Sequence, residues 1–86
     1  MLYEISPDCV ACEVEDGFVI LNLESNLYFG LDGIGAEIWK NLEEPRSIDD
    51  LIEFTLSNYE VCAADCSNDV LALVAEMRQN GLVRQV

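Results

Sequence analysis

The sequence contains no histidine, and only 4 of its 86 residues are lysine or arginine. The absence of histidine excludes a Ser-His or Cys-His catalytic pair, because both pairs use an imidazole as the base. The shortage of basic residues argues against nucleic-acid binding, since proteins hold phosphates mainly with lysine and arginine. The 17 acidic residues give a formal net charge of −13. This charge indicates either a solvated surface or a preference for basic partners.

Long apolar runs and targeting signals are also missing. No apolar stretch approaches the roughly 20 residues that span a membrane. The first residues, MLYEISPD, have neither the basic start nor the apolar core of a secretory signal. The glycine-rich segment 30–35 lacks the lysine of a phosphate-binding loop. We therefore expect a cytoplasmic protein with no membrane partner, no cofactor, no catalytic residues and no enzyme activity.

A change of hydrophobic period at residues 27–39 organises the chain. Apolar side chains alternate from Leu27 to Leu31, as in a half-buried strand, and then recur at helical spacing from Ile34 to Leu42. Asp32 stands at the junction, where its carboxylate is expected to cap the first turn of the helix. Strands therefore precede this junction and helices follow it.

The whole chain, residues 1–86, is expected to form a single α+β domain of the order β-β-β-α-α-α. The expected strands are 9–14, 18–23 and 27–31, with a possible strand arm before Pro7. A turn at 15–17, in which Gly17 is free to take a positive φ, joins the first two. The expected helices run over 33–42, from an N-cap at Ser47 to a frayed end near 57–59, and over 64–80, with Asn80-Gly81 as a C-cap. This arrangement predicts a three-stranded antiparallel sheet attached to a winged helix-turn-helix-like bundle, with the third strand at an edge.

The four cysteines form two pairs, Cys9/Cys12 and Cys62/Cys66, which could in principle hold zinc. Residues three apart on a strand face opposite ways, so the first pair converges only if a turn intervenes. We therefore expect no metal site, although a zinc-stabilised interaction module remains an alternative. Disulfides are not expected in a reducing cytoplasm.

The segment VILNLESNLYFGLDGIGAEIWKNLEEPRSIDDLI, continued by DVLALVAEMRQNGLV, resembles the PqqD-like family. These domains are the RiPP recognition elements of ribosomal-peptide maturation systems. The resemblance implies a non-catalytic adaptor that binds the leader segment of a precursor peptide and delivers it to a modifying enzyme such as a leader peptidase. The leader is expected to add as a strand beside the third strand, facing the third helix. A free-standing domain of this size is most similar to those of lasso-peptide pathways.

An open third strand can accept an extended peptide, and the apolar stripe of the third helix can supply the wall of the site. Acidic residues beside that stripe would attract a basic leader. The alternative for Leu73 and Met77 is a purely structural place in the core, and the alternative for the protein is a winged-helix DNA-binding regulator. The expected peptide-binding residues are Asn26, Leu27, Tyr28, Phe29, Gly30, Asp69, Val70, Leu73, Val74 and Met77.

Overall fold

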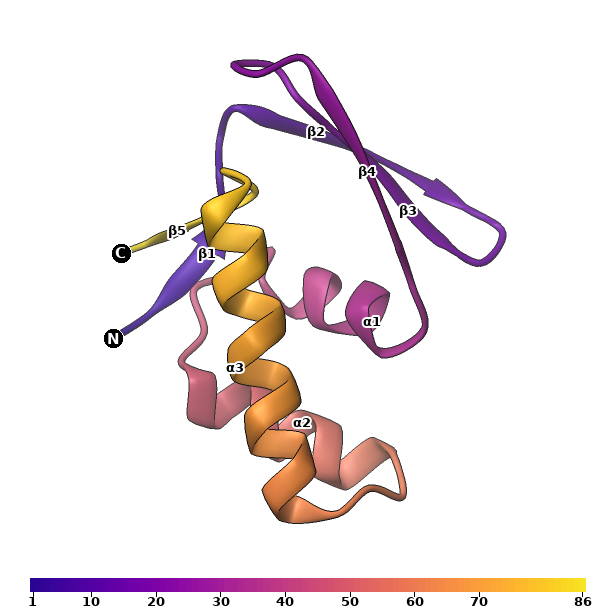
Figure 1. The fold of residues 1–86 in the computed structure, drawn as a ribbon, viewed down its shortest axis with the longest axis vertical. Coiled ribbons are helices and arrows are strands. Elements are labelled where there is room, and N and C mark those ends of the chain that lie inside the picture. Colours follow the sequence, from indigo (N-terminus) through magenta and orange to yellow (C-terminus); the bar gives the residue numbers. More distant parts are fainter.

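The computed structural model describes residues 1–86 and contains three helices and two antiparallel sheets (Figure 1). The expected order of three strands followed by three helices is confirmed, and one further short strand stands at each end of it. The elements are β1 (Tyr3–Ile5), β2 (Cys9–Val14), β3 (Gly17–Asn22), β4 (Leu27–Asp32), α1 (Gly33–Asn41), α2 (Ile48–Asn58), α3 (Ala63–Gln79) and β5 (Val83–Gln85).

The antiparallel sheet has the order β2-β3-β4, so β3 is central and β4 lies at an edge, as the sequence predicts. Its register runs from Gly17 opposite Asp32 to Asn22 opposite Leu27. Phe18 and Ile20 of β3 point inward and are buried. Figure 1 shows the sheet above α1 and the C-terminal end of α3, with α2 at the opposite end of the molecule. The sheet and the helices thus form two layers around one core.

The two ends of the chain pair with each other in a second, two-stranded sheet of β1 and β5. Tyr3 lies opposite Gln85, and it also exchanges backbone hydrogen bonds with Arg46 in the connection between α1 and α2. The sequence suggests the first of these strands but not their pairing. A three-residue strand carries almost no period, and its partner is far away along the chain.

The start of α2 is capped as the sequence predicts, whereas the start of α1 is not. The Ser47 hydroxyl accepts a hydrogen bond from the Asp50 amide at 3.0 Å, and the Asp50 carboxylate accepts one from the Ser47 amide at 3.1 Å. The hydrogen bond from the Ser47 amide, and then that from the Ser47 side chain, hold the pKa of the Asp50 carboxyl below its usual value. Asp32 occupies the N-cap position of α1 but makes no capping bond. It still belongs to β4 and alternates to the outer side of the sheet, and the chain turns into the helix at Gly33, whose φ is +53°.

Gly17 does not take the positive φ that the turn suggests. It is the first residue of β3, and a β-carbon there would collide with the carbonyl oxygen of Leu31 on β4. Close approach of two strands therefore explains this glycine. Gly81 does take a positive φ, +74°, and ends α3 as predicted.

The core lies between the sheet and the three helices. Trp39 of α1 is only 1% exposed, which confirms that it is a core residue. None of the helices combines the length and apolar character that a membrane span needs. The buried apolar residues are Tyr3, Phe18, Ile20, Ala36, Ile38, Trp39, Leu42, Leu51, Cys66, Val70, Val74, Met77, Leu82 and Val83.

A candidate peptide-binding groove

The outer edge of β4 is open to a further strand. Only β3 pairs with β4, so alternate residues of β4 direct their amides and carbonyls away from the sheet. Proteins usually protect such an edge with lysine, proline or a bulge, and the β4 sequence LYFGLD contains neither lysine nor proline. Six residues of unprotected edge can pair with an extended peptide.

A groove runs between this edge and α3. It is a hollow of about 260 Å³, which we call the β4–α3 groove. Leu73 and Met77 form its helical wall, and Phe29 and Leu31 form its strand wall. The lining residues are Phe29, Gly30, Leu31, Leu73, Glu76, Met77, Asn80 and Leu82.

A second hollow, of about 230 Å³, lies among the three helices near the start of α3, and we call it the α1–α3 pocket. Leu73 lines both this pocket and the β4–α3 groove, so the two hollows adjoin along α3. The pocket is mainly apolar, with Asp69 as its one charged residue. Its lining residues are Ile34, Gly35, Ile38, Thr55, Val61, Cys66, Asp69, Val70 and Leu73.

The structure brings most of the predicted helical residues to these hollows, but not Val74. Leu73 and Met77 line the groove, and Asp69 and Val70 line the pocket. Val70 and Met77 are each only 2% exposed, so they form the floor and belong to the core at the same time. Val74 lies in the core and lines a different hollow with Tyr3 and Ile48. It therefore faces away from β4, and the geometry does not place it in the groove.

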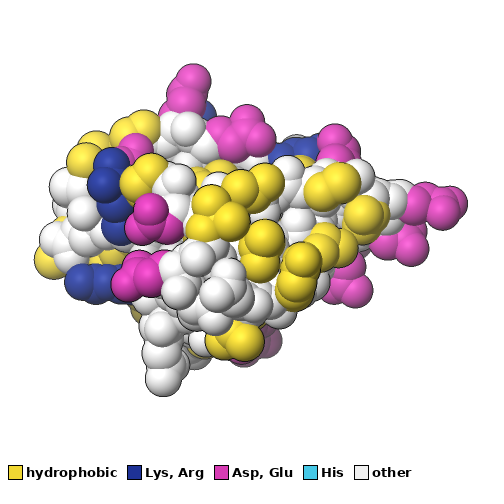
Figure 2. Space-filling view, turned by 90° about the horizontal axis from the view of Figure 1, so that it is seen from above, with side chains coloured by type: hydrophobic (Ala, Val, Ile, Leu, Met, Phe, Trp, Pro, Cys, Tyr) yellow, Lys and Arg dark blue, Asp and Glu magenta, His cyan; other side chains and the backbone are white.

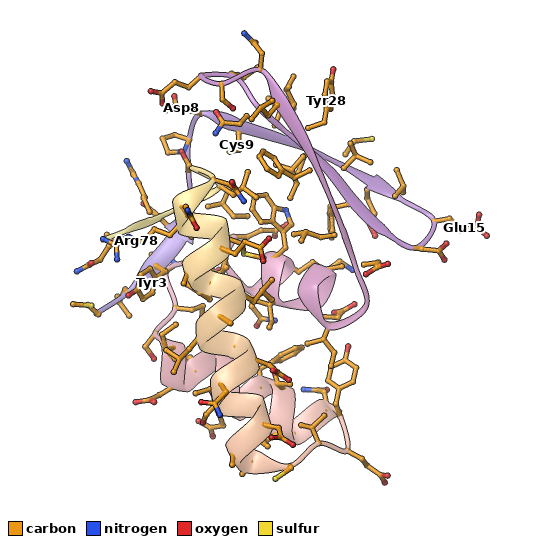
Figure 3. All side chains as sticks on the ribbon, viewed as in Figure 1. Tyr3, Asp8, Cys9, Glu15, Tyr28 and Arg78 are labelled. Atoms are coloured by element: carbon orange, nitrogen blue, oxygen red, sulfur yellow. The ribbon has the colours of Figure 1, made fainter.

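The predicted residues of the strand take three different positions. Phe29 and Gly30 line the groove itself. Asn26 belongs to the turn before β4, with a φ of +61°, and Leu27 is exposed at the start of the strand. Tyr28 is 70% exposed and points away from the helices (Figure 3). Its backbone lies at the open edge, but its side chain stands on the outer side of the sheet.

Asn22 fixes the end of the groove, although it is not among the binding residues that the sequence predicts. Its buried side chain donates a hydrogen bond from Nδ2 to the carbonyl of Asn80 at 2.9 Å. Its Oδ1 accepts from the amides of Glu24 at 2.9 Å and Ser25 at 3.3 Å. These bonds join the turn before β4 to the C-terminal end of α3. The sequence carries one signal for this role, namely a polar residue at an inward-facing position of an otherwise apolar strand.

The groove and the pocket are acidic. Glu76 and Asp69 line them, and no lysine or arginine does. The four basic residues of the chain have partners elsewhere: Lys40 with Glu13, Arg46 with Glu44, Arg84 with Glu4, and Arg78 with the ring of Tyr3. Unpaired carboxylates beside an apolar wall favour a peptide that combines apolar and basic side chains.

The four cysteines do not converge, and Cys12 is exposed on β2. The thiol of Cys9 contacts the carbonyl of Gly81, whereas Cys62 and Cys66 lie at the start of the helix, about 25 Å away. No three Cys, Asp or Glu side chains lie close enough together to hold a metal ion. Backbone hydrogen bonds from Asp65 and Ala64 lower the pKa of the Cys62 thiol, whereas burial, and then the charge of Asp8, raises the pKa of Cys9.

Comparison with known proteins identifies one family and two similar structures. Residues 17–83 match the sequence profile of the family described as coenzyme PQQ synthesis protein D (PqqD). The structure of TbiB1 in complex with the TbiA(beta) leader peptide is similar with a TM-score of 0.89 and 26% identity, over 96% of each chain. That of lasso peptide synthetase B1 complexed with the leader peptide has a TM-score of 0.84 and 29% identity, over 96% of this chain and 98% of the other. No curated protein sequence matches the chain.

Proposed function

The chain belongs to the PqqD family, and on this premise we propose that it binds the leader segment of a ribosomally synthesised precursor peptide and is not itself an enzyme. The observation that carries the proposal is the unprotected edge of β4 beside the groove on α3. Two leader-bound proteins share this fold over nearly their whole length. The protein is accordingly a RiPP recognition element of the lasso-peptide type.

The leader pairs with the edge of β4 from Leu27 to Gly30 and becomes the fourth strand of the sheet. Its backbone then satisfies the amides and carbonyls that β3 leaves free, while alternate side chains enter the groove against Phe29 and Leu73. Val70 and Met77 form the floor below them. Asp69 and Glu76 attract basic residues of the leader and raise the association rate. The remaining leader side chains point to the outer side of the sheet.

The protein delivers the bound leader to a separate modifying enzyme, and a leader peptidase is the enzyme that this proposal favours. An adaptor that holds the leader as a strand leaves the following segment of the precursor free to reach an active site. Because a newly translated precursor is available in the cytoplasm, we place the protein there.

The two alternative functions are not favoured. A winged-helix regulator needs a basic recognition helix, and on α3 the only basic residue is Arg78, which lies over the ring of Tyr3. A zinc-stabilised module needs converging ligands, and Cys9 lies at the opposite end of α3 from Cys62 and Cys66. The structure therefore favours neither a DNA-binding regulator nor a zinc-stabilised module.

Hydrogen exchange on the protein tests the binding mode. The probe is the leader of the precursor peptide encoded beside the gene for this chain, with a scrambled leader as the control. The amides of alternate residues between Leu27 and Leu31 should gain protection, because the others are already bonded to β3. Protection confined to α2 or β2, with none along β4, would show that the groove is misplaced.

A further inference from the structure

The outer side of the sheet is an exposed apolar surface. The pairing register places Val10, Leu21 and Tyr28 in one row across the sheet, and Cys12, Val19 and Gly30 in the next. Val10 is 54% exposed, Val19 39% and Tyr28 70%. Figure 2 shows apolar side chains gathered across this side of the molecule. We call the surface of Val10, Cys12, Val14, Val19, Leu21 and Tyr28 the outer face.

The composition of the outer face differs from that of an ordinary solvent-facing sheet surface. An antiparallel sheet with one face on the core usually alternates apolar residues inward with polar residues outward. On β2 the alternation is weak, since the inward-facing Cys9 is followed by Val10, Cys12 and Val14 on the outside. A third row consists of Val14, Gly17 and Asp32. Across the three rows the only charged residue is Asp32, at the end of β4. Contiguous apolar surface of this kind marks an interaction site.

The charges around the outer face define the kind of partner. Acidic residues stand in the connections at both ends of the sheet, and the basic residues are absent from its three strands. Figure 2 shows acidic side chains at the rim of the apolar area, and where lysine or arginine side chains also occur there, acidic side chains lie next to them. A second copy of the chain is disfavoured, because face-to-face pairing would bring together two chains of formal charge −13. The complementary surface is therefore an apolar patch bordered by lysine and arginine.

We propose that the outer face docks the modifying enzyme through an apolar surface with a basic rim, an inference that rests on the proposed function. The leader strand would extend this same face, because its outward side chains lie next to Tyr28 and beside the open space at Gly30. The enzyme then contacts the sheet and the leader together. Leader and enzyme each raise the affinity of the domain for the other, since such coupling is reciprocal.

Two surface variants test this inference, with the maturation protease encoded beside the gene for this chain as the probe. Val10→Lys places a positive charge on β2, the strand farthest from the leader edge, and Val10→Thr is a milder replacement that keeps the β-branched shape. Leu71→Lys is the matched control, because Leu71 is 50% exposed on α3. Protease affinity is measured by surface plasmon resonance, and leader affinity by fluorescence polarisation.

We expect Val10→Lys to weaken protease binding about tenfold or more, and Val10→Thr to weaken it less. Leader affinity should stay within about twofold of the wild type in both. Unchanged protease binding in Val10→Lys, or an equal loss in Leu71→Lys, overturns the inference. It is also overturned if the wild type is a dimer and Val10→Lys a monomer. If leader binding is absent while protease binding still depends on Val10, the proposed function fails and the docking face stands.

Discussion

Replacing Asn22 by alanine should destabilise the fold and loosen the groove together. The Asn22 side chain is 5% exposed and makes three hydrogen bonds, to Asn80, Glu24 and Ser25. A buried hydrogen bond contributes about 1 kcal/mol net, so the three amount to about 3 kcal/mol. A domain of this size has roughly 4–13 kcal/mol of stability, of which this is a substantial part.

The unfolding free energy can be measured by urea denaturation, with the fluorescence of Trp39 as the probe. Trp39 is the only tryptophan and is buried, so its emission reports on the core. Asn58→Ala is the matched control, because that side chain also donates to a backbone carbonyl, at 2.8 Å, but is exposed. We expect Asn58→Ala to cost less than about 1 kcal/mol.

A second replacement separates the two halves of the Asn22 side chain. Asn22→Asp keeps an acceptor for the amides of Glu24 and Ser25 but loses the donor to the Asn80 carbonyl. It also sets a carboxylate against that carbonyl, so the destabilisation should be at least as large as that of alanine. Leader affinity of the folded fraction should fall in both variants, because the end of the groove is no longer fixed. A loss of stability below about 0.5 kcal/mol in Asn22→Ala would refute the reasoning.

Three further outcomes are expected. Asp69→Lys should weaken binding of a basic leader mainly through slower association, more at low salt, and equal rates in stopped-flow measurements at low and high salt would contradict this. Trp39→Ala should cost about 3–5 kcal/mol by urea unfolding, and a folded variant that lost only leader binding would show that Trp39 is not a core residue. Cys62 should be alkylated faster than Cys9 between about pH 7 and pH 8, because its lowered pKa gives more thiolate there, and peptide mapping would reveal the opposite order.

Local patterns predict much of the fold. The alternation along β4, the N-cap at Ser47 and the glycine after Asn80 are short-range signals, and the structure contains each of the elements they indicate. The edge position of β4 follows from the order of elements, because no strand succeeds it before the helices. The pairing of β1 with β5 depends on contacts between the chain ends, which no local pattern encodes.

The site is less predictable, because its geometry depends on how α3 is rotated. Apolar residues on this helix face two directions, so spacing alone does not separate Leu73, which lines the groove, from Val74, which packs toward Tyr3. The role of Asn22 depends on Asn80, 58 positions away. Asp32 satisfies the rule for an N-cap, but its place in β4 directs its side chain elsewhere.

The pairing of β1 with β5 has a practical consequence for protein engineering. Because Tyr3 and Gln85 are neighbours, a short linker can join the two ends of the chain. New ends can then be opened in the exposed turn between β2 and β3, which gives a circular permutant. The two-stranded sheet lies on the side of α3 that carries Val74 and Arg78, away from β4. A fluorescent protein or an affinity tag fused at either end is therefore carried on the opposite side from the incoming peptide.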